Sequence, residues 1–310
     1  MSSVLSESRF HNEEAAFAYV ESKLWPDGPF CPFCGECERI GRLSGATTRI
    51  GLRKCYACRK PFTVRIGTIF ESSHAPLRIW LQAMHLMCSS KKGISTRQLQ
   101  RTLGVGMKTA WFLGHRIRAA MDDGFGGFDG PVGGSGKTVE ADEMYLGKSP
   151  KSRKFKGERP PVVLSLVERG GPIRSMFLDH RTVRSALWQH LDFDSRLVTD
   201  GSVHYAKLLH VGHHEAVDHS KSEWVRDDVH TQTLDGYFSI FKRGLIGVYQ
   251  HIDAKHLNRY LAEFDFRMNN RAKLGINDVQ RTCNAILGAR GKRLTYRTAG
   301  RVAGAEAVTA

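Results

Sequence analysis

The chain has 310 residues, of which 41% are hydrophobic and 25% charged, a composition typical of a soluble globular protein with room for about two domains. The formal net charge is +15, and a surplus of that size favours a polyanionic partner, either nucleic acid or an anionic membrane surface. No apolar run reaches the roughly 18 residues that span a bilayer, and the polar, acidic start lacks a secretion signal. These features exclude an integral membrane protein and predict a cytoplasmic one with reduced cysteines.

The positive charge is concentrated in residues 53–118, where thirteen basic residues are opposed by a single acid, Glu71. A second basic block covers residues 148–159, and a third covers residues 267–301. One such block alone is equally compatible with a solvated surface. The concentration of basic residues in 53–118 is typical of a protein that neutralises nucleic-acid phosphates and thereby releases counterions. We therefore expect a nucleic-acid partner.

The pattern of the sequence changes along the chain. Residues 12–24 predict a short amphipathic helix with Asn12 as its N-cap, and a cysteine-rich segment follows. Residues 76–122 have a helical pattern, and seven glycines within residues 124–137 indicate a flexible linker. Beyond the linker, strand-like runs alternate with helical patterns, which predicts an α/β sheet domain. The expected strands are 138–147, 160–169, 173–179 and 195–200, and the expected helices are 183–191, 234–245 and 254–270.

Two C-x-x-C pairs, Cys31 with Cys34 and Cys55 with Cys58, are separated by 20 residues. A tetrahedral zinc ion needs four soft ligands, and each tight turn supplies two thiolates. Two matched pairs predict a structural Zn²⁺ ion in a zinc ribbon, whereas a redox motif needs only one pair. Cys37 is a spare thiol. The basic residues around the second pair, which we expect to bind DNA, are Arg53, Lys54, Arg59 and Lys60.

A helix-turn-helix pattern follows the cysteine segment. Ser95 caps a first helix, residues 104–106 form the turn, and a second helix begins at Met107. Lys108 and Thr109 stand at the start of the second helix, where side chains reach base edges or phosphates. A helical hairpin that only packs is the alternative. The turn and the positive charge favour DNA binding.

Three aspartates stand apart from the surface charges. Asp142 lies in a predicted strand, Asp200 closes another, and Asp235 lies on a predicted helix. One stripe of that helix is apolar and would face the sheet, and a polar stripe carries Gln232, Asp235 and Lys242. Such acids can converge on two Mg²⁺ (or Mn²⁺) ions, which prefer oxygen ligands and support phosphodiester displacement. Taken singly, each aspartate is more often a cap or a surface residue.

Six blocks follow one another along the chain: WPDGPFCPFCG (25–35), KCYACRKPFTVRIGTIFESSHAPLRIW (54–80), VEADEMYLG (139–147), VTDGSVHY (198–205), VHTQTLDGYFSIFKRGL (229–245) and HLNRYLAEFDFRMNNR (256–271). Together they resemble bacterial insertion-sequence transposases of the Merlin superfamily. The resemblance implies a zinc ribbon and a helix-turn-helix joined to a ribonuclease H-like mixed sheet with flanking helices. It also implies that Asp142 and Asp200 are the first two metal-binding acids and that Lys242 is the associated helix lysine.

The third catalytic position has two candidates. The family commonly shows Asn where this chain has Gln232, and Glu where it has Asp235. A change from Glu to Asp draws the carboxylate back by roughly 1.5 Å, and a misplacement of about 1 Å can cost on the order of a hundredfold in rate. Glu140 and Glu143 are candidate auxiliary ligands. On an ideal strand Glu140 shares the face of Asp142, and Glu143 points away.

These patterns divide the chain into six expected segments. They are an N-terminal helix (1–30), a zinc ribbon (31–70), a helix-turn-helix DNA-binding domain (71–123), a glycine-rich linker (124–137), a ribonuclease H-like catalytic domain (138–275), and a basic C-terminal segment and tail (276–310).

The function that we expect is that of a DNA transposase. It would bind the terminal inverted repeats of an insertion sequence at the nucleoid, cut them with Mg²⁺, and join them to target DNA. Both partners are double-stranded DNA, and pairing two DNA ends requires a homo-oligomer. One alternative is a non-catalytic DNA-binding repressor derived from a transposase. The other is a ribonuclease H-like nuclease that hydrolyses without joining. A strand-transfer assay distinguishes the three.

Overall fold

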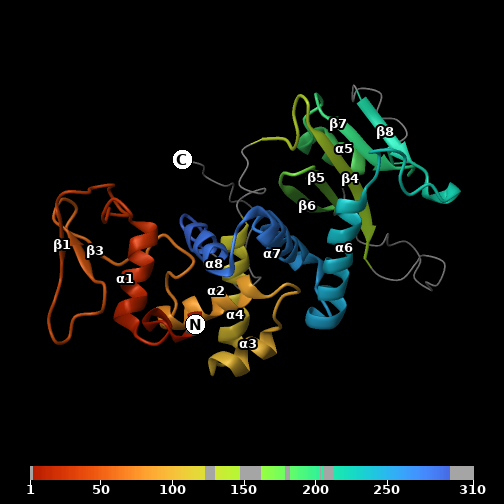
Figure 1. Ribbon diagram of the computed structural model, residues 1–310. Helices are drawn as coiled ribbons and strands as arrows, with labels where there is room; N and C mark the ends of the chain where they lie inside the picture. The colour runs from red at the N-terminus through yellow and green to blue at the C-terminus, as the bar shows by residue number, and fades with distance from the viewer. Residues whose placement is uncertain are drawn as a thin grey trace, which may run out of the picture.

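The structure is a computed structural model that describes residues 3–122, 130–146, 162–178, 182–202, 204–205 and 213–293. It has a small N-terminal sheet, a group of helices, and a larger mixed sheet with helices on both faces (Figure 1). This confirms the predicted fold class. Within the described ranges, no helix combines the length and the apolar character needed to cross a bilayer. The basic block at 148–159 lies outside the described residues.

The small sheet carries the cysteines. Its three antiparallel strands are β1 (Ile40–Arg42), β2 (Arg53–Cys55) and β3 (Pro61–Phe62). The first cysteine pair lies in the loop before β1, and the second pair begins at the last residue of β2. The Cys31 Sγ lies 3.6 Å from the Cys58 Sγ, and the Cys34 Sγ lies 3.7 Å from the Cys55 Sγ. Four soft sulfur ligands within 4.8 Å of one another fit the tetrahedral zinc ion that the spacing predicts.

Five helices share one apolar core beside this sheet. They are α1 (Glu13–Leu24), α2 (Leu77–Ser89), α3 (Thr96–Leu103), α4 (Met107–Met121) and α8 (Asp278–Leu287). The Glu13 carboxylate accepts hydrogen bonds from the backbone N–H groups of Leu77 (2.7 Å) and Arg78 (3.1 Å). Because α2 begins after a proline and has no side-chain cap of its own, α1 supplies that cap.

The helix-turn-helix has the boundaries that its residues predict. The Ser95 hydroxyl accepts a hydrogen bond from the N–H of Gln98 at the start of α3. The helix ends at Gly104, whose φ of 63° is left-handed, a conformation that favours glycine. Three residues later α4 begins at Met107, and Leu99 and Leu103 of α3 are buried in the shared core.

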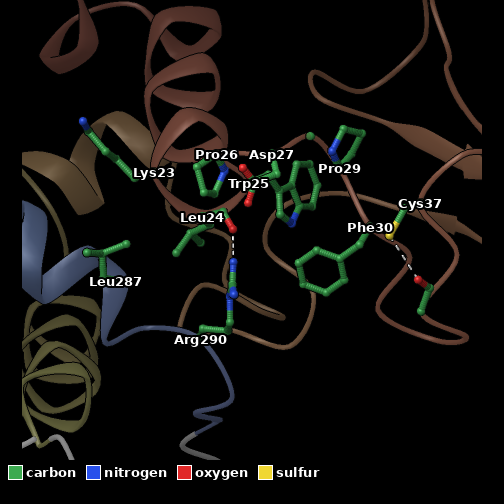
Figure 2. Close-up of a pocket in the computed structure, with 12 residues that line it drawn as sticks. Lys23, Leu24, Trp25, Pro26, Asp27, Pro29, Phe30, Cys37, Leu287 and Arg290 are labelled. Atoms are coloured by element: carbon green, nitrogen blue, oxygen red, sulfur yellow. Dashed lines mark hydrogen bonds between the residues drawn. The ribbon is translucent and has the colours of Figure 1, made fainter.

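The basic C-terminal segment that we expected over residues 276–310 is described through residue 293. Helix α8 packs against α1, α2 and α4, because Ala285 and Ile286 give it a buried apolar face. Beyond α8, the Arg290 guanidinium donates to the carbonyl of Leu24. Figure 2 shows this contact at the side of a pocket of about 710 Å³ that lies between the end of α1, the loop before the cysteines, and α8.

The large sheet has the strand order β6-β5-β4-β7-β8. Its strands are β4 (Thr138–Tyr145), β5 (Val162–Glu168), β6 (Ile173–Leu178), β7 (Arg196–Asp200) and β8 (His213–Val217). The pairs β4–β5 and β5–β6 are antiparallel, whereas β4–β7 and β7–β8 are parallel. Strand β8 was not predicted from the sequence.

Helices cover both faces of this sheet (Figure 1). Helix α5 (Val183–His190) packs on one face, and α6 (Gln232–Gly244) and α7 (Leu257–Asn269) pack on the other. On β4, Val139 and Ala141 belong to the core under α5, whereas Met144 belongs to the core under α6. Side chains alternate along a strand, so Asp142 faces α6.

Helix α7 also covers the free edge of β6. Side chains of α7 accept hydrogen bonds from alternate backbone N–H groups of the strand, at 2.6 to 3.0 Å. The three donor–acceptor pairs are Ile173 with Asn269, Ser175 with Asp265, and Phe177 with Asn258. The helix thereby satisfies an edge that would otherwise be open to another strand.

The described end of the predicted linker packs onto the sheet domain. Val132 donates its N–H to the carbonyl of His190 at 2.7 Å and accepts from the N–H of Asp192. A Cβ on Gly133 would lie 2.0 Å from the Ser195 Oγ, and the φ of this glycine is 105°. Here the glycine therefore permits a close approach between chain segments.

We predict that the ribbon depends on zinc. Cys31→Ser should abolish stoichiometric zinc binding and unfold the ribbon, because it removes one of four ligands from a site worth on the order of 10 kcal/mol. Metal analysis of the purified protein, with circular dichroism, measures both effects. Cys37→Ser is the matched control, since this exposed thiol lies outside the four-sulfur group. Loss of zinc from the control, or full zinc in Cys31→Ser, would contradict the assignment.

Candidate active site

Two predicted acids meet where the pairing between β4 and β7 ends. The parallel register pairs Ala141 with Thr199, so the next residues, Asp142 and Asp200, lie side by side. Glu143 joins them, and one carboxylate oxygen from each of the three residues lies within 4.8 Å of the others. We call Asp142, Glu143 and Asp200 the acidic cluster.

The acidic cluster is electrostatically unfavourable on its own. Burial raises the pKa of Asp142, and the neighbouring charges of Asp200 and Glu143 raise it further, to about 7. Three half-buried carboxylates in such proximity supply the hard oxygen ligands that Mg²⁺ prefers. The donor set therefore fits a divalent cation.

Glu143 reaches the acidic cluster from the opposite face of the strand. Its carboxylate accepts hydrogen bonds from the Ser202 hydroxyl (2.9 Å) and from the Tyr205 hydroxyl (2.5 Å), and Tyr205 is buried in the core under α5. The expectation that Glu143 points away from Asp142 thus holds for the strand face. Its carboxylate nevertheless meets Asp142 and Asp200, because all three residues lie just beyond the last residue pair of the β4–β7 ladder.

Glu140 shares the face of Asp142 but performs a different task. Its carboxylate is fully buried and accepts hydrogen bonds from Arg169 (2.9 Å) and from both the N–H and the hydroxyl of Thr233 (3.0 Å each). These contacts fasten the N-terminus of α6 to β4. Glu140 therefore lies outside the acidic cluster and holds the helix that carries Asp235.

Helix α6 carries the remaining candidates on its exposed face. Gln232 is its first residue and Asp235 lies in its first turn. The charge of Asp235 contributes to the raised pKa of Asp142, although Asp235 lies outside the group of closely spaced ligand atoms. Lys242 is exposed two turns further on, about 10 Å along the helix axis.

The structure adds a pair of side chains that the sequence analysis did not single out. The Tyr145 hydroxyl lies 2.9 Å from the His204 Nε2. Burial, Glu143 and Asp200 raise the pKa of this tyrosine, whose ring is 48% exposed. Both residues fall within the blocks VEADEMYLG and VTDGSVHY, which also hold the acids. The electrostatic effect of Glu143 and Asp200 on Tyr145 places this pair near the acidic cluster.

The predicted DNA-contacting residues differ in their surroundings. Arg53 pairs with Glu21 at 2.7 Å and lies over the Trp25 ring, so its charge is engaged within the protein. The other candidates remain accessible: Arg59, Lys60 and Lys108 are exposed, and Lys54 and Thr109 are half-buried.

Comparisons with known proteins agree with this architecture. Residues 11–61 match the family model of a transposase zinc-ribbon domain, and residues 133–269 match that of an ISXO2-like transposase domain. An uncharacterized protein in the transposable element ISH50 of Halobacterium salinarum is 26% identical, over 83% of this chain and 91% of that protein. No solved structure gives a significant match. The resemblance to insertion-sequence transposases is thereby confirmed: one region of the chain matches a transposase zinc ribbon, and a later region matches an ISXO2-like transposase domain.

Proposed function

We propose that the protein is a DNA transposase that cuts the ends of an insertion sequence and joins them to target DNA. The observation that carries the proposal is the acidic cluster on the adjacent strands β4 and β7, inside the region that matches a transposase domain. Electrostatic repulsion among three carboxylates suits a site that holds cations. The relative from a transposable element supports the same biological setting.

Asp142, Glu143 and Asp200 would hold Mg²⁺ (or Mn²⁺), with Asp235 or Gln232 completing the site from α6. Bound metal ions would activate the attacking oxygen and stabilise the leaving oxygen of a phosphodiester displacement. Ser202 and Tyr205 hold the Glu143 carboxylate in place, and Glu140 holds the helix that carries Asp235. Lys242, on the exposed face of α6, would contact a phosphate of the DNA end.

The N-terminal half would bind the terminal inverted repeats. Exposed Arg59 and Lys60 on the ribbon and Lys108 on α4 present positive charge, and phosphate contacts of this kind provide most of the non-specific affinity for DNA. The start of α4 would enter the major groove, as the second helix of a helix-turn-helix does. Two DNA ends would be paired by at least two copies of the chain.

We predict that Asp142→Asn and Asp200→Asn each lower Mg²⁺-dependent cleavage of element-end DNA by at least about a thousandfold, because each removes a charged metal ligand. DNA affinity should change by less than about twofold, since these acids lie away from the predicted binding helix. Gel assays of cleavage and binding measure both quantities. Asp194→Asn, at an exposed position before β7, is the matched control. Cleavage by Asp142→Asn at the wild-type rate would refute the proposed active site.

A second prediction concerns Asp235, the acid that α6 would add to the site. We expect Asp235→Asn to reduce cleavage by about a hundredfold or more, and Asp235→Glu to equal or exceed the wild type, because the longer side chain extends toward Asp142. Gln232→Ala should cost less than tenfold. Single-turnover cleavage rates with Mg²⁺ provide the measurement. If Gln232→Ala has the larger effect, Gln232 and not Asp235 completes the active site. If neither variant changes cleavage because the wild type only binds DNA, the protein is a repressor derived from a transposase.

A third prediction concerns binding. Lys108→Ala should weaken binding to element-end DNA and reduce the slope of log affinity against log salt concentration by about one, because one phosphate contact is lost. Fluorescence anisotropy at several salt concentrations measures the slope. Lys255→Ala, which removes an exposed cation already paired with Asp253 at 2.7 Å, is the control. An unchanged slope in Lys108→Ala would contradict a phosphate contact at this residue.

A further inference from the structure

A buried carboxylate lies at the centre of the contact between α4 and α7. Glu263 of α7 is fully buried. The Arg118 Nε of α4 donates to one of its oxygens at 2.6 Å, and the Tyr249 hydroxyl donates to the other at 2.7 Å. Arg267, one turn further along α7, also pairs with it. One side chain of the sheet domain therefore binds the second helix of the helix-turn-helix.

Aromatic rings and backbone groups enclose this group. The Arg118 guanidinium lies 4.0 Å from the centre of the Tyr260 ring and 5.2 Å from that of Tyr249, distances at which a cation is attracted to a ring face. Arg267 donates from its Nε to the carbonyl of Met87 on α2 at 3.3 Å. The contact thus joins α2 and α4 on one side to α7 on the other.

The charges in this group depend on one another. Burial alone would raise the pKa of Glu263, but Arg118 and Arg267 outweigh that effect and hold it below its ordinary value. Both arginines are themselves almost fully buried. Breaking such a group by removing one partner is strongly destabilising, whereas replacing the whole group by apolar residues is often neutral. Loss of a single partner would therefore loosen the contact between α4 and α7, whereas a fully apolar replacement would keep it packed.

Tyr249 connects this contact both to α6 and to the loop before α3. It closes the π-helical turn Leu245–Tyr249, which continues α6, the helix that carries Asp235. A Cβ on Gly93, in the loop before α3, would lie 1.9 Å from the Tyr249 hydroxyl. Only glycine leaves room for this approach. The helix-turn-helix therefore contacts the sheet domain at α4 and again beside α3.

The covalent connection between α4 and the sheet is rich in glycine. Residues 124–137 contain seven glycines, and a glycine-rich sequence does not by itself define an angle between two domains. A fixed geometry must then come from the short connection between α7 and α8 and from non-covalent contacts. In Figure 1, α7 lies between the N-terminal helices and the sheet, where the Glu263 group joins them.

We propose that the group formed by Arg118, Glu263, Arg267 and Tyr249 fixes the distance between the helix-turn-helix and the acidic cluster, and so determines which phosphodiester bond is cut relative to the bound sequence. Glu263 is a positioning residue. It touches neither DNA nor the acids, and it acts by holding α4 on α7. The inference rests on the proposed function, and it adds how the cut site is chosen.

The test maps cut positions at single-nucleotide resolution. The full chain is incubated with Mg²⁺ and a labelled duplex that carries one end of the element encoding it. The wild type should cut one bond at a constant distance from its footprint. Glu263→Gln should spread cutting over several neighbouring bonds, with DNA affinity within about twofold of the wild type, because two buried arginines lose their counter-charge.

Two further variants separate positioning from stability. The triple variant Arg118→Met/Glu263→Leu/Arg267→Met removes all the charges while keeping the contact packed, so it should restore a single cut position. Tyr249→Phe removes only one hydroxyl that donates to Glu263, and it should broaden the cut distribution even if Glu263→Gln fails to fold. Cutting at the single wild-type bond by every folded variant would overturn the inference. A wild type that binds but never cuts would instead overturn the proposed function.

Discussion

The proposed active site depends on three mutually repelling carboxylates that two parallel strands bring to one place. Because β4 and β7 are hydrogen-bonded in register, Asp142 and Asp200 cannot separate without disrupting the sheet. Glu143 is held against them by Ser202 and Tyr205. A protein that maintains this arrangement, with the pKa of Asp142 raised to about 7, favours the binding of a divalent cation.

The two halves of the chain have different proposed roles, DNA binding and catalysis, and they pack against each other through α4 and α7. The N-terminal half holds the basic stretch of residues 53–118, and the sheet carries the acidic cluster. Their connection passes through buried Glu263, which pairs with Arg118 across the contact between α4 and α7. Helix α8, from the far end of the sequence, packs back among the N-terminal helices. The sheet domain is thus flanked on both sides in sequence by parts of one helical unit.

Local signals in the sequence predicted much of this structure. Caps such as Ser95, the C-x-x-C pairs and the strand ending at Asp200 depend on neighbouring residues, and the structure contains the corresponding elements. Features set by distant contacts were not predicted. Strand β8 begins with two histidines, its neighbour β7 provides its pairing, and the burial of α8 depends on α2. The position of the Glu143 carboxylate was not predicted, because it depends on a hydrogen bond from Tyr205, 62 residues away.

Metal binding by the acidic cluster is the central claim, and electron paramagnetic resonance of Mn²⁺ tests it directly, without DNA or catalysis. Zinc-loaded wild-type protein should bind Mn²⁺ and reduce the signal of the free ion in a saturable titration. The double variant Asp142→Asn/Asp200→Asn, with its zinc retained, should leave the free-ion signal unchanged. Equal Mn²⁺ binding by the two proteins would contradict the account.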